Sequence, residues 1–363
     1  MEVVDAVNTK HLGITARGVA ILCLVYVAVA AAMAPTTYFA ILTEYTLKKY
    51  SLALPLFALF GMAGVAVFSR PSSPLTFIVE KLRDRVKGAL IVVGIFLLCA
   101  AAFSTLKHIT PLYVSFFADP VLAWLDATIH AGDPWKTTHA VFPQPLEPGL
   151  FVLYGPVWFV QMVGMVLVAA FTKDDAVRTR YFLSLLLVAV VLGSVVRILG
   201  SSAGPIFFQR IAGGDRFADL IAVLGTTFSG KAMIATSDYL YSSYALDRTV
   251  FGTGIAAMPS LHVAVALLNA LFLSQFGRAI SYWGWFYFAA IMFGSVYFGW
   301  HYAVDGYLAI AATALIWRYS GRSINSQIAV RENSKLAYST PRTAVVESVP
   351  GTSVCVGPAK AGV

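Results

Sequence analysis

Charged residues are scarce in this chain. Asp, Glu, Lys and Arg make up 12% of its 363 residues, whereas 58% of them are hydrophobic, and the mean hydropathy is +0.75. A soluble globule needs more polar side chains than this to cover its surface. The composition therefore excludes an ordinary soluble domain and predicts a protein that crosses a membrane several times.

Cysteine is rare as well. There are three, Cys23, Cys99 and Cys355, an odd number, and the first two lie inside apolar runs, where a thiol behaves as a small hydrophobic side chain. The sequence therefore indicates neither a disulfide framework nor a metal–thiolate site, and no cofactor is expected.

The net charge of +8 does not predict a nucleic-acid partner, because the basic residues are spread among the loops instead of forming a cluster. Membrane orientation and anionic lipid head groups explain this charge better.

Eight apolar runs approach the ~20 residues that a helix needs to cross the hydrocarbon core. They cover approximately residues 18–43, 51–69, 88–105, 149–171, 181–200, 256–274, 282–300 and 302–317. The first run exceeds the core of a signal peptide, so we expect an uncleaved span. The pattern predicts an all-α fold, a polytopic membrane helix bundle of about eight spans.

The segments between these runs differ in character. Residues 70–87 alternate apolar and basic side chains, which suits an interfacial amphipathic helix or a solvated loop. Residues 106–148 mix aromatic residues, prolines and aspartates, and are expected to form an ordered segment that lies on the outer membrane surface. The three aspartates of this segment, spaced by seven, suggest either a metal site or one side of a surface helix. They are Asp119, Asp126 and Asp133. We favour the helix and predict no metal.

These segments divide the chain into three parts. Residues 1–87 hold the first two spans and the basic segment. Residues 88–317 form a six-span core with outer segments 106–148 and 201–255. Residues 318–363, rich in Ser, Thr, Val, Gly and Pro without periodicity, are expected to be a disordered cytoplasmic tail.

Lys and Arg accumulate in cytoplasmic loops. With eight spans and both termini in the cytoplasm, more than half of the 26 Lys and Arg residues fall on the inner side. This orientation places the end of the fifth run, the start of the sixth and the turn before the eighth on the periplasmic, luminal or exterior side.

Two histidines and an aspartate lie at the edges of the last three runs. His301 and Asp305 are four residues apart, so on a helix they share one face and can contact each other. A carboxylate that holds one ring nitrogen leaves the other free as a nucleophile or base. His262 can be the second proton-handling group. The alternative is that both histidines are buried helix-end residues, but ionisable groups at membrane depth favour a functional role.

The residues before His262 suggest an anion site. Residues 252–260 form a glycine-containing loop, with Gly254 and Ser260 among its members, that enters a helix. The N–H groups at a helix entrance bind phosphate readily. Histidines, a carboxylate and this loop are the parts needed for metal-free phosphoryl transfer, and they suit acyl transfer less well.

These residues carry a resemblance to a known family. Pro259-Ser260-x-His262 and Gly299-x-His301-x-x-x-Asp305 resemble the second and third motifs of the type 2 phosphatidic acid phosphatase superfamily. With Met258 before this proline and Tyr302 after His301, the two motifs resemble most closely those of the inositol phosphorylceramide synthase (inositolphosphotransferase) branch of the superfamily.

The resemblance spans about residues 200–317 and implies a six-helix membrane core with catalytic His262, His301 and Asp305. It makes His301 a transient phosphohistidine that Asp305 orients, while His262 protonates the leaving oxygen.

The chain departs from the family pattern at its phosphate-binding residues. The first motif, Lys-x6-Arg-Pro, is absent, since Ala63 stands where Arg70-Pro71 would require the lysine, and Ser295 replaces the arginine expected six residues before His301. Arg210 is our first substitute and Arg197 our second. Arg210 is equally well explained as a loop charge or head-group contact, and Arg197 as a residue snorkelling from a helix end.

The leading hypothesis is a membrane lipid phosphotransferase acting on a phospholipid donor, with a lipid or polyol alcohol as acceptor. Loss of the phosphatase-type arginine favours transfer, with a lipid phosphate phosphatase that uses water as the alternative. A proton-coupled transporter or flippase and an inactive scaffold are less favoured. The first lacks a clear internal repeat, and the second is at odds with three filled catalytic positions. The oligomeric state is left open.

Overall fold

The computed structural model describes residues 16–50, 54, 73–250 and 252–339. These ranges fold entirely into helices and connecting turns, which confirms the all-α prediction. The N-terminal helices are α1 (Ala16–Met33), α2 (Pro35–Thr43) and η1 (Glu44–Tyr50), followed by α4 (Pro74–Tyr113), α5 (Asp119–His130), α6 (Pro134–Val141), η2 (Gln144–Leu146), α7 (Glu147–Tyr154) and α8 (Pro156–Phe171). The rest are α9 (Asp175–Leu187), η3 (Val188–Val196), α10 (Arg197–Leu199), η4 (Pro205–Phe207), α11 (Phe208–Ile211), α12 (Ala218–Leu224), α13 (Phe228–Ala245), α14 (Leu261–Leu273), α15 (Arg278–Tyr297) and α16 (Ala303–Ser339).

Five helical stretches of the described chain are long and apolar enough to cross a membrane: Ala16–Met33, Val86–Tyr113, Gln144–Phe171, Asp175–Leu199 and Arg278–Tyr297. The shorter α14 is also apolar. The polytopic membrane bundle is therefore confirmed, whereas the count of eight spans stays a prediction. The expected second span, 51–69, lies outside the described residues apart from Leu54.

Several helix ends differ from the apolar runs for local reasons. The first run divides before Pro35, since proline cannot continue a helix from the preceding turn. The fourth run divides at Gly155, before Pro156. The sixth run becomes helical only at Leu261, because Ser260 caps the helix by accepting a hydrogen bond from the Val263 N–H at 3.3 Å.

The expected disordered tail is partly helical. α16 continues through Ser339, and a disordered cytoplasmic tail stays a prediction. Residues 318–339 contain no proline and several good helix formers, which favours the helix. Residues 340–363 lie outside the described part.

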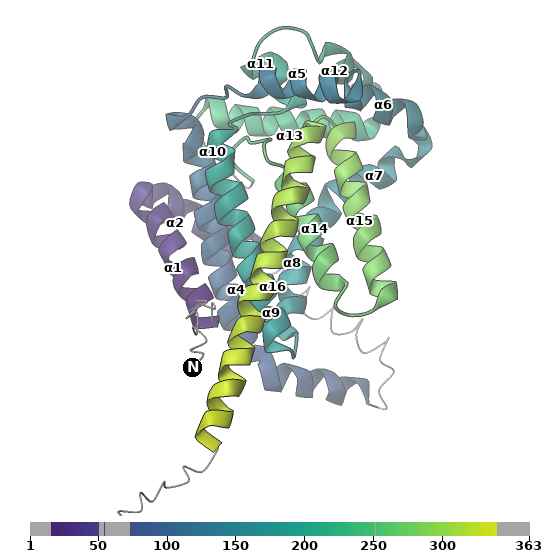
Figure 1. Ribbon diagram of the computed structural model, residues 1–363. Coiled ribbons are helices and arrows are strands. Elements are labelled where there is room, and N and C mark those ends of the chain that lie inside the picture. The colour runs from purple at the N-terminus through teal and green to yellow at the C-terminus, as the bar shows by residue number, and fades with distance from the viewer. Residues whose placement is uncertain (1–15, 51–53, 55–72, 251, 340–363) are drawn as a thin grey trace, which may run out of the picture.

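The basic segment before the third run is helical from Pro74 onwards and forms the first turns of α4. In Figure 1 these turns lie across one end of the bundle, while the rest of α4 runs along it. This is the arrangement expected of an interfacial helix, and its contact with a membrane surface stays a prediction.

The two outer segments form a cap. Figure 1 shows α5, α6, α11, α12 and α13 lying across the end of the bundle opposite the start of α4. Buried aromatic residues hold this layer together, for example Phe208 and Phe217, whose rings are 5.2 Å apart. The cap is built from residues 114–148 and from the described residues of 201–255, whereas residues 106–113 belong to α4. The division of the chain into three parts stays a prediction.

The helix α14 lies inside the bundle and packs against α15 and α16. Its residues 263–268 are all buried. The first turn of α14, the end of η3 and the turn before α16 thus come to the capped end of the bundle, where the site residues are found.

Candidate active site

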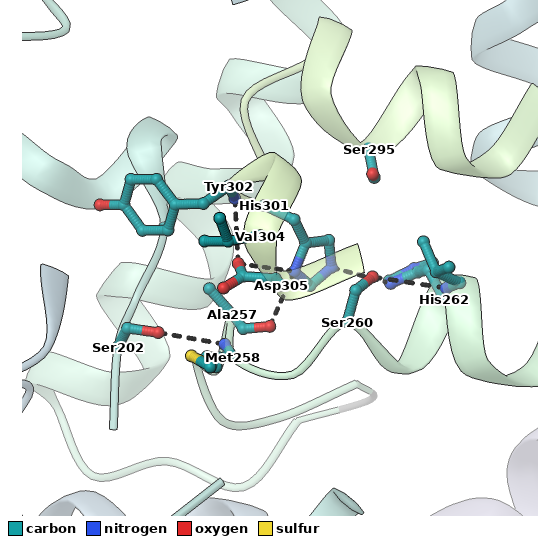
Figure 2. Close-up of polar contacts among 12 residues, drawn as sticks. Ser202, Ala257, Met258, Ser260, His262, Ser295, His301, Tyr302, Val304 and Asp305 are labelled. Carbon is teal, nitrogen blue, oxygen red and sulfur yellow. Dashed lines mark hydrogen bonds and ion pairs between the residues drawn. The ribbon is translucent and has the colours of Figure 1, made fainter. Parts of the chain in front are cut away.

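His301 lies in the turn between α15 and α16, and its ring is fixed on one side. Its Nδ1–H donates to the carbonyl oxygen of Ala257 at 2.8 Å, and the carboxylate oxygen Oδ2 of Asp305 is 3.6 Å from the same nitrogen (Figure 2). A carbonyl oxygen can only accept, so Nδ1 carries the proton and Nε2 keeps its lone pair in the neutral ring. The free Nε2 is the nitrogen that can act as a nucleophile.

The proximity of His301 and Asp305 does not come from a shared helix face, as the sequence predicted. α16 begins at Ala303, after His301. Asp305, fully buried, accepts a hydrogen bond from the Tyr302 N–H at 2.9 Å, which folds the turn back on itself and brings the carboxylate under the imidazole. At 3.6 Å the contact is electrostatic instead of a hydrogen bond.

His262, in the first turn of α14, faces His301. Its Nδ1 lies 3.4 Å from the Nε2 of His301, and the ring is held between Tyr154, stacked at 4.9 Å, and Trp158, at 4.3 Å. The structure therefore brings together all three residues for which the sequence predicted a catalytic role. The roles themselves stay predictions.

The loop before α14 approaches α4 closely. Gly254 has φ +86°, and a Cβ there would lie 2.8 Å from the carbonyl oxygen of Lys107, so only glycine fits without strain. Ser260 is fully buried; besides capping α14, its N–H donates to the Asp305 carbonyl oxygen at 3.3 Å. Gly254 faces the site cavity, whereas the observed contacts of Ser260 join α14 to α16.

The two candidate arginines lie in different places. Arg210 forms an ion pair with Asp238 and lies over the ring of Tyr241, so the structure does not bring it to the histidines. Arg197 is buried, and its guanidinium donates to the carbonyl oxygens of Gly193 at 2.7 Å and Leu106 at 3.1 Å. Arg197, but not Arg210, lines the site cavity.

Lys107 lines the same cavity, although the sequence motifs do not include it. The third apolar run ends at Thr105, but α4 continues to Tyr113, so that Lys107 of α4 shares the lining with both histidines. A lysine within two residues of an apolar run is the signal that could have revealed it, because a cation at that depth is costly unless it has a function.

Asp119 and Asp126 support the site from the cap. Asp119 accepts hydrogen bonds from the N–H groups of Ala203 and Gly204, both at 2.8 Å, and from the Tyr302 hydroxyl at 2.9 Å. Asp126 accepts from the N–H groups of Ala303, at 2.8 Å, and Val304, at 2.9 Å, at the start of α16. Burial raises the pKa of both carboxyls, against the opposing effect of these hydrogen bonds.

Asp133, the third aspartate of this series, pairs instead with Arg216 at 3.0 Å. Among the described residues no group of three His, Cys, Asp or Glu side chains is arranged to hold a metal ion. The spacing of seven thus places Asp119 and Asp126 on one buried side of α5, where they bind backbone.

A cavity of about 740 Å³ adjoins the two histidines, within the range of small-molecule sites. Lys107, Arg197, His262 and His301 line it together. Much of the rest of its lining is apolar and comes from α1, α4, α8 and η3.

Fold and site together define a polytopic membrane protein with two facing histidines and a buried carboxylate at the capped end of its helices. Residues 150–319 match the family model described as the PAP2 superfamily. The match covers His262, His301 and Asp305, and it supports the superfamily that the motifs resemble, with phosphatase or phosphotransferase chemistry on lipid phosphates. No curated protein and no solved structure matches the chain.

Proposed function

We propose that this protein is a lipid phosphotransferase that moves a phosphoryl-linked head group from a phospholipid donor to an alcohol acceptor through a phosphohistidine on His301. One observation carries the proposal. The Nδ1 of His301 donates to the Ala257 carbonyl and lies beside Asp305, so that its Nε2 is directed to His262. Both histidines adjoin a cavity whose lining includes Lys107 and Arg197.

In the first half of the reaction, Nε2 of His301 forms a bond to phosphorus while the bond from phosphorus to the lipid oxygen breaks. His262 donates a proton to the departing oxygen, and the Asp305 carboxylate stabilises the positive imidazole. In the second half the acceptor hydroxyl attacks phosphorus, His262 takes its proton, and His301 is released.

The contact between the two histidine rings limits how these reaction steps can begin. A phosphorus atom bonded to Nε2 occupies the place of the 3.4 Å contact with His262. Donor binding therefore has to separate the rings, and we expect His262 to turn within the aromatic pair Tyr154 and Trp158.

Lys107 is our candidate for binding the phosphate. Arg197 already donates to the backbone of η3 and α4, whereas within the described chain no hydrogen bond or ion pair joins the Lys107 ammonium to another residue. Lys107 can thus contact a phosphate oxygen, and the buried Arg197 adds positive potential. In this proposal they replace the missing family arginines, and Arg210, which is paired with Asp238, takes no part.

The test uses purified protein in lipid nanodiscs with labelled phospholipid donors, among them phosphatidylinositol, each with and without an alcohol acceptor such as ceramide. We expect cleavage that depends on the acceptor, a transferred product, and an acid-labile phosphohistidine after rapid quenching. His301→Ala should abolish all three.

Cleavage that proceeds equally well without an acceptor would support the phosphatase alternative, in which water attacks the intermediate. If wild-type protein cleaves no lipid phosphate, or if His301→Ala retains activity, the proposed function is wrong.

A further inference from the structure

The cavity extends well beyond the histidines, along one face of α4. The α4 residues that line it recur every three or four positions, as expected for one side of a helix. They are Val92, Ile95, Phe96, Cys99, Ala100, Phe103, Ser104 and Lys107. At ~1.5 Å per residue the stretch from Val92 to Lys107 is roughly 22 Å long. This exceeds half the ~30 Å hydrocarbon core, the depth that the chains of one leaflet occupy.

The facing walls of this part are also apolar. Val19, Ala20 and Cys23 of α1 line it on one side, and Phe182 and Leu186 of α9 line it on another. The cations and histidines gather at one end, with Lys107, while Arg178 lies among the lining residues near the start of α9 and is paired with Asp175. The cavity thus joins a cationic end to a long apolar stretch.

We infer that this apolar stretch, the tail slot, holds an acyl chain of the lipid donor while its phosphate lies at Lys107 and the histidines. The inference rests on the proposed function and adds a role for the N-terminal helices. α1 and α4 lie before the family-matched residues 150–319, so two walls of the slot come from outside the matched region.

We expect the tail slot to discriminate between lipid donors by chain length and to add little to their binding affinity. An acyl chain that moves from the bilayer into the slot leaves one apolar medium for another, so its burial gains little. The slot instead fixes the orientation of the bound lipid, so that its phosphorus atom is positioned at His301. Narrowing the slot should therefore discriminate between lipids by chain length.

The matched pair Ala20→Phe and Ala28→Phe tests this. Ala20 lines the slot, whereas Ala28 is exposed on the same helix. With one head group on long or short acyl chains, Ala20→Phe should lower kcat/KM for the long-chain donor, relative to the short-chain donor, by roughly tenfold, the scale of discrimination by a misfitting apolar group. Ala28→Phe should leave this ratio unchanged.

A second measurement does not depend on turnover. A long-chain phosphatidic acid with a photoreactive diazirine near the end of one chain is irradiated with His301→Ala protein, and the adducts are mapped. We expect labels on Ala20, Cys23 and the lining face of α4, reduced in the Ala20→Phe form. Labels confined to exposed side chains such as Ile21 and Leu24 would show annular lipid only and would overturn the inference.

The two proposals fail separately. If wild-type protein turns over neither donor, the proposed function fails while the adducts can still locate the chain. If both donors are turned over and Ala20→Phe leaves the long-to-short ratio unchanged, the tail slot is wrong and the phosphotransferase proposal is untouched.

Discussion

At the scale of single residues, the chemistry of the site depends on which ring nitrogen of His301 is hydrogen-bonded and on the charged group beside the ring. The Ala257 carbonyl fixes the tautomer, and Asp305 supplies the only nearby negative charge that His301 contacts within the described chain. The carboxylate also accepts the Tyr302 N–H, so its geometric and electrostatic roles can be separated by an isosteric change.

Asp305→Asn keeps an oxygen for the Tyr302 N–H but removes the negative charge. We expect kcat to fall by about 10² to 10⁴, the usual contribution of such a group, because the imidazolium formed on attack loses its counter-charge. Head-group transfer and thermal unfolding are measured together. A kcat within a few-fold of wild type in a folded variant would mean that Asp305 is not needed for the chemistry.

Lys107→Met retains the apolar stem of the side chain and removes its charge. Hydrogen bonds to charged groups contribute ~1.5–3 kcal/mol, so inhibition by vanadate or inorganic phosphate should weaken roughly 10- to 100-fold, with a higher KM for the donor. Lys231→Met, an exposed lysine of α13, is the matched control. Equal inhibition constants for the two variants would remove Lys107 from the phosphate site.

At the scale of elements, the decisive contact joins α5 to α16. The first N–H groups of a helix have no partner within it, and at the start of α16 those of Ala303 and Val304 donate to the carboxylate of Asp126. A negative charge there also suits the helix dipole. The cap thereby holds the turn that carries His301 and Asp305.

Asp126→Ala should therefore affect both stability and activity. It leaves buried N–H groups without a partner, at a cost of about 1–3 kcal/mol, and lets the first turn of α16 move away from His262. We expect a lower melting temperature and a lower kcat. Asp126→Asn keeps one acceptor oxygen and should recover part of both; if it behaved like alanine, the capping role would be contradicted.

The sequence predicts the membrane helices more completely than it predicts the residues of the candidate site. The apolar runs located the membrane helices because burial in lipid dictates composition, but their ends depend on local events such as Pro35 and the Ser260 cap. His262, His301 and Asp305 could be named as candidates because each lies in a short local motif, and their catalytic roles stay predictions. The position of Lys107 at the end of an apolar run and of Arg197 within one can be seen in the sequence. That both line the same cavity depends on the packing of α4 against η3, which local patterns do not show. The pairing of Arg210 with Asp238 joins residues from two helices, and no local pattern predicts it.

At the scale of the whole molecule, the two ends of the bundle differ. The capped end carries the site, and the opposite end carries the start of α4, the turn between α8 and α9 and the extended α16 (Figure 1). Basic residues are abundant at the second end, where Lys173 lies in the turn at residues 172–174 and Arg178 and Arg180 follow it in α9. Since cytoplasmic segments accumulate Lys and Arg, we predict that the site faces the periplasm, lumen or exterior.

Single cysteines at the two ends test this orientation. In a background where Cys23, Cys99 and Cys355 are replaced by alanine, Asp215→Cys and Lys173→Cys place thiols on exposed positions of the cap and of the opposite turn. A membrane-impermeant maleimide added to intact cells should label the thiol at 215 and reach the one at 173 only after permeabilisation. The reverse pattern would place the histidines on the cytosolic side, where a donor from the inner leaflet would have to be used, and labelling of both thiols in intact cells would mean that these ends are not separated by a membrane.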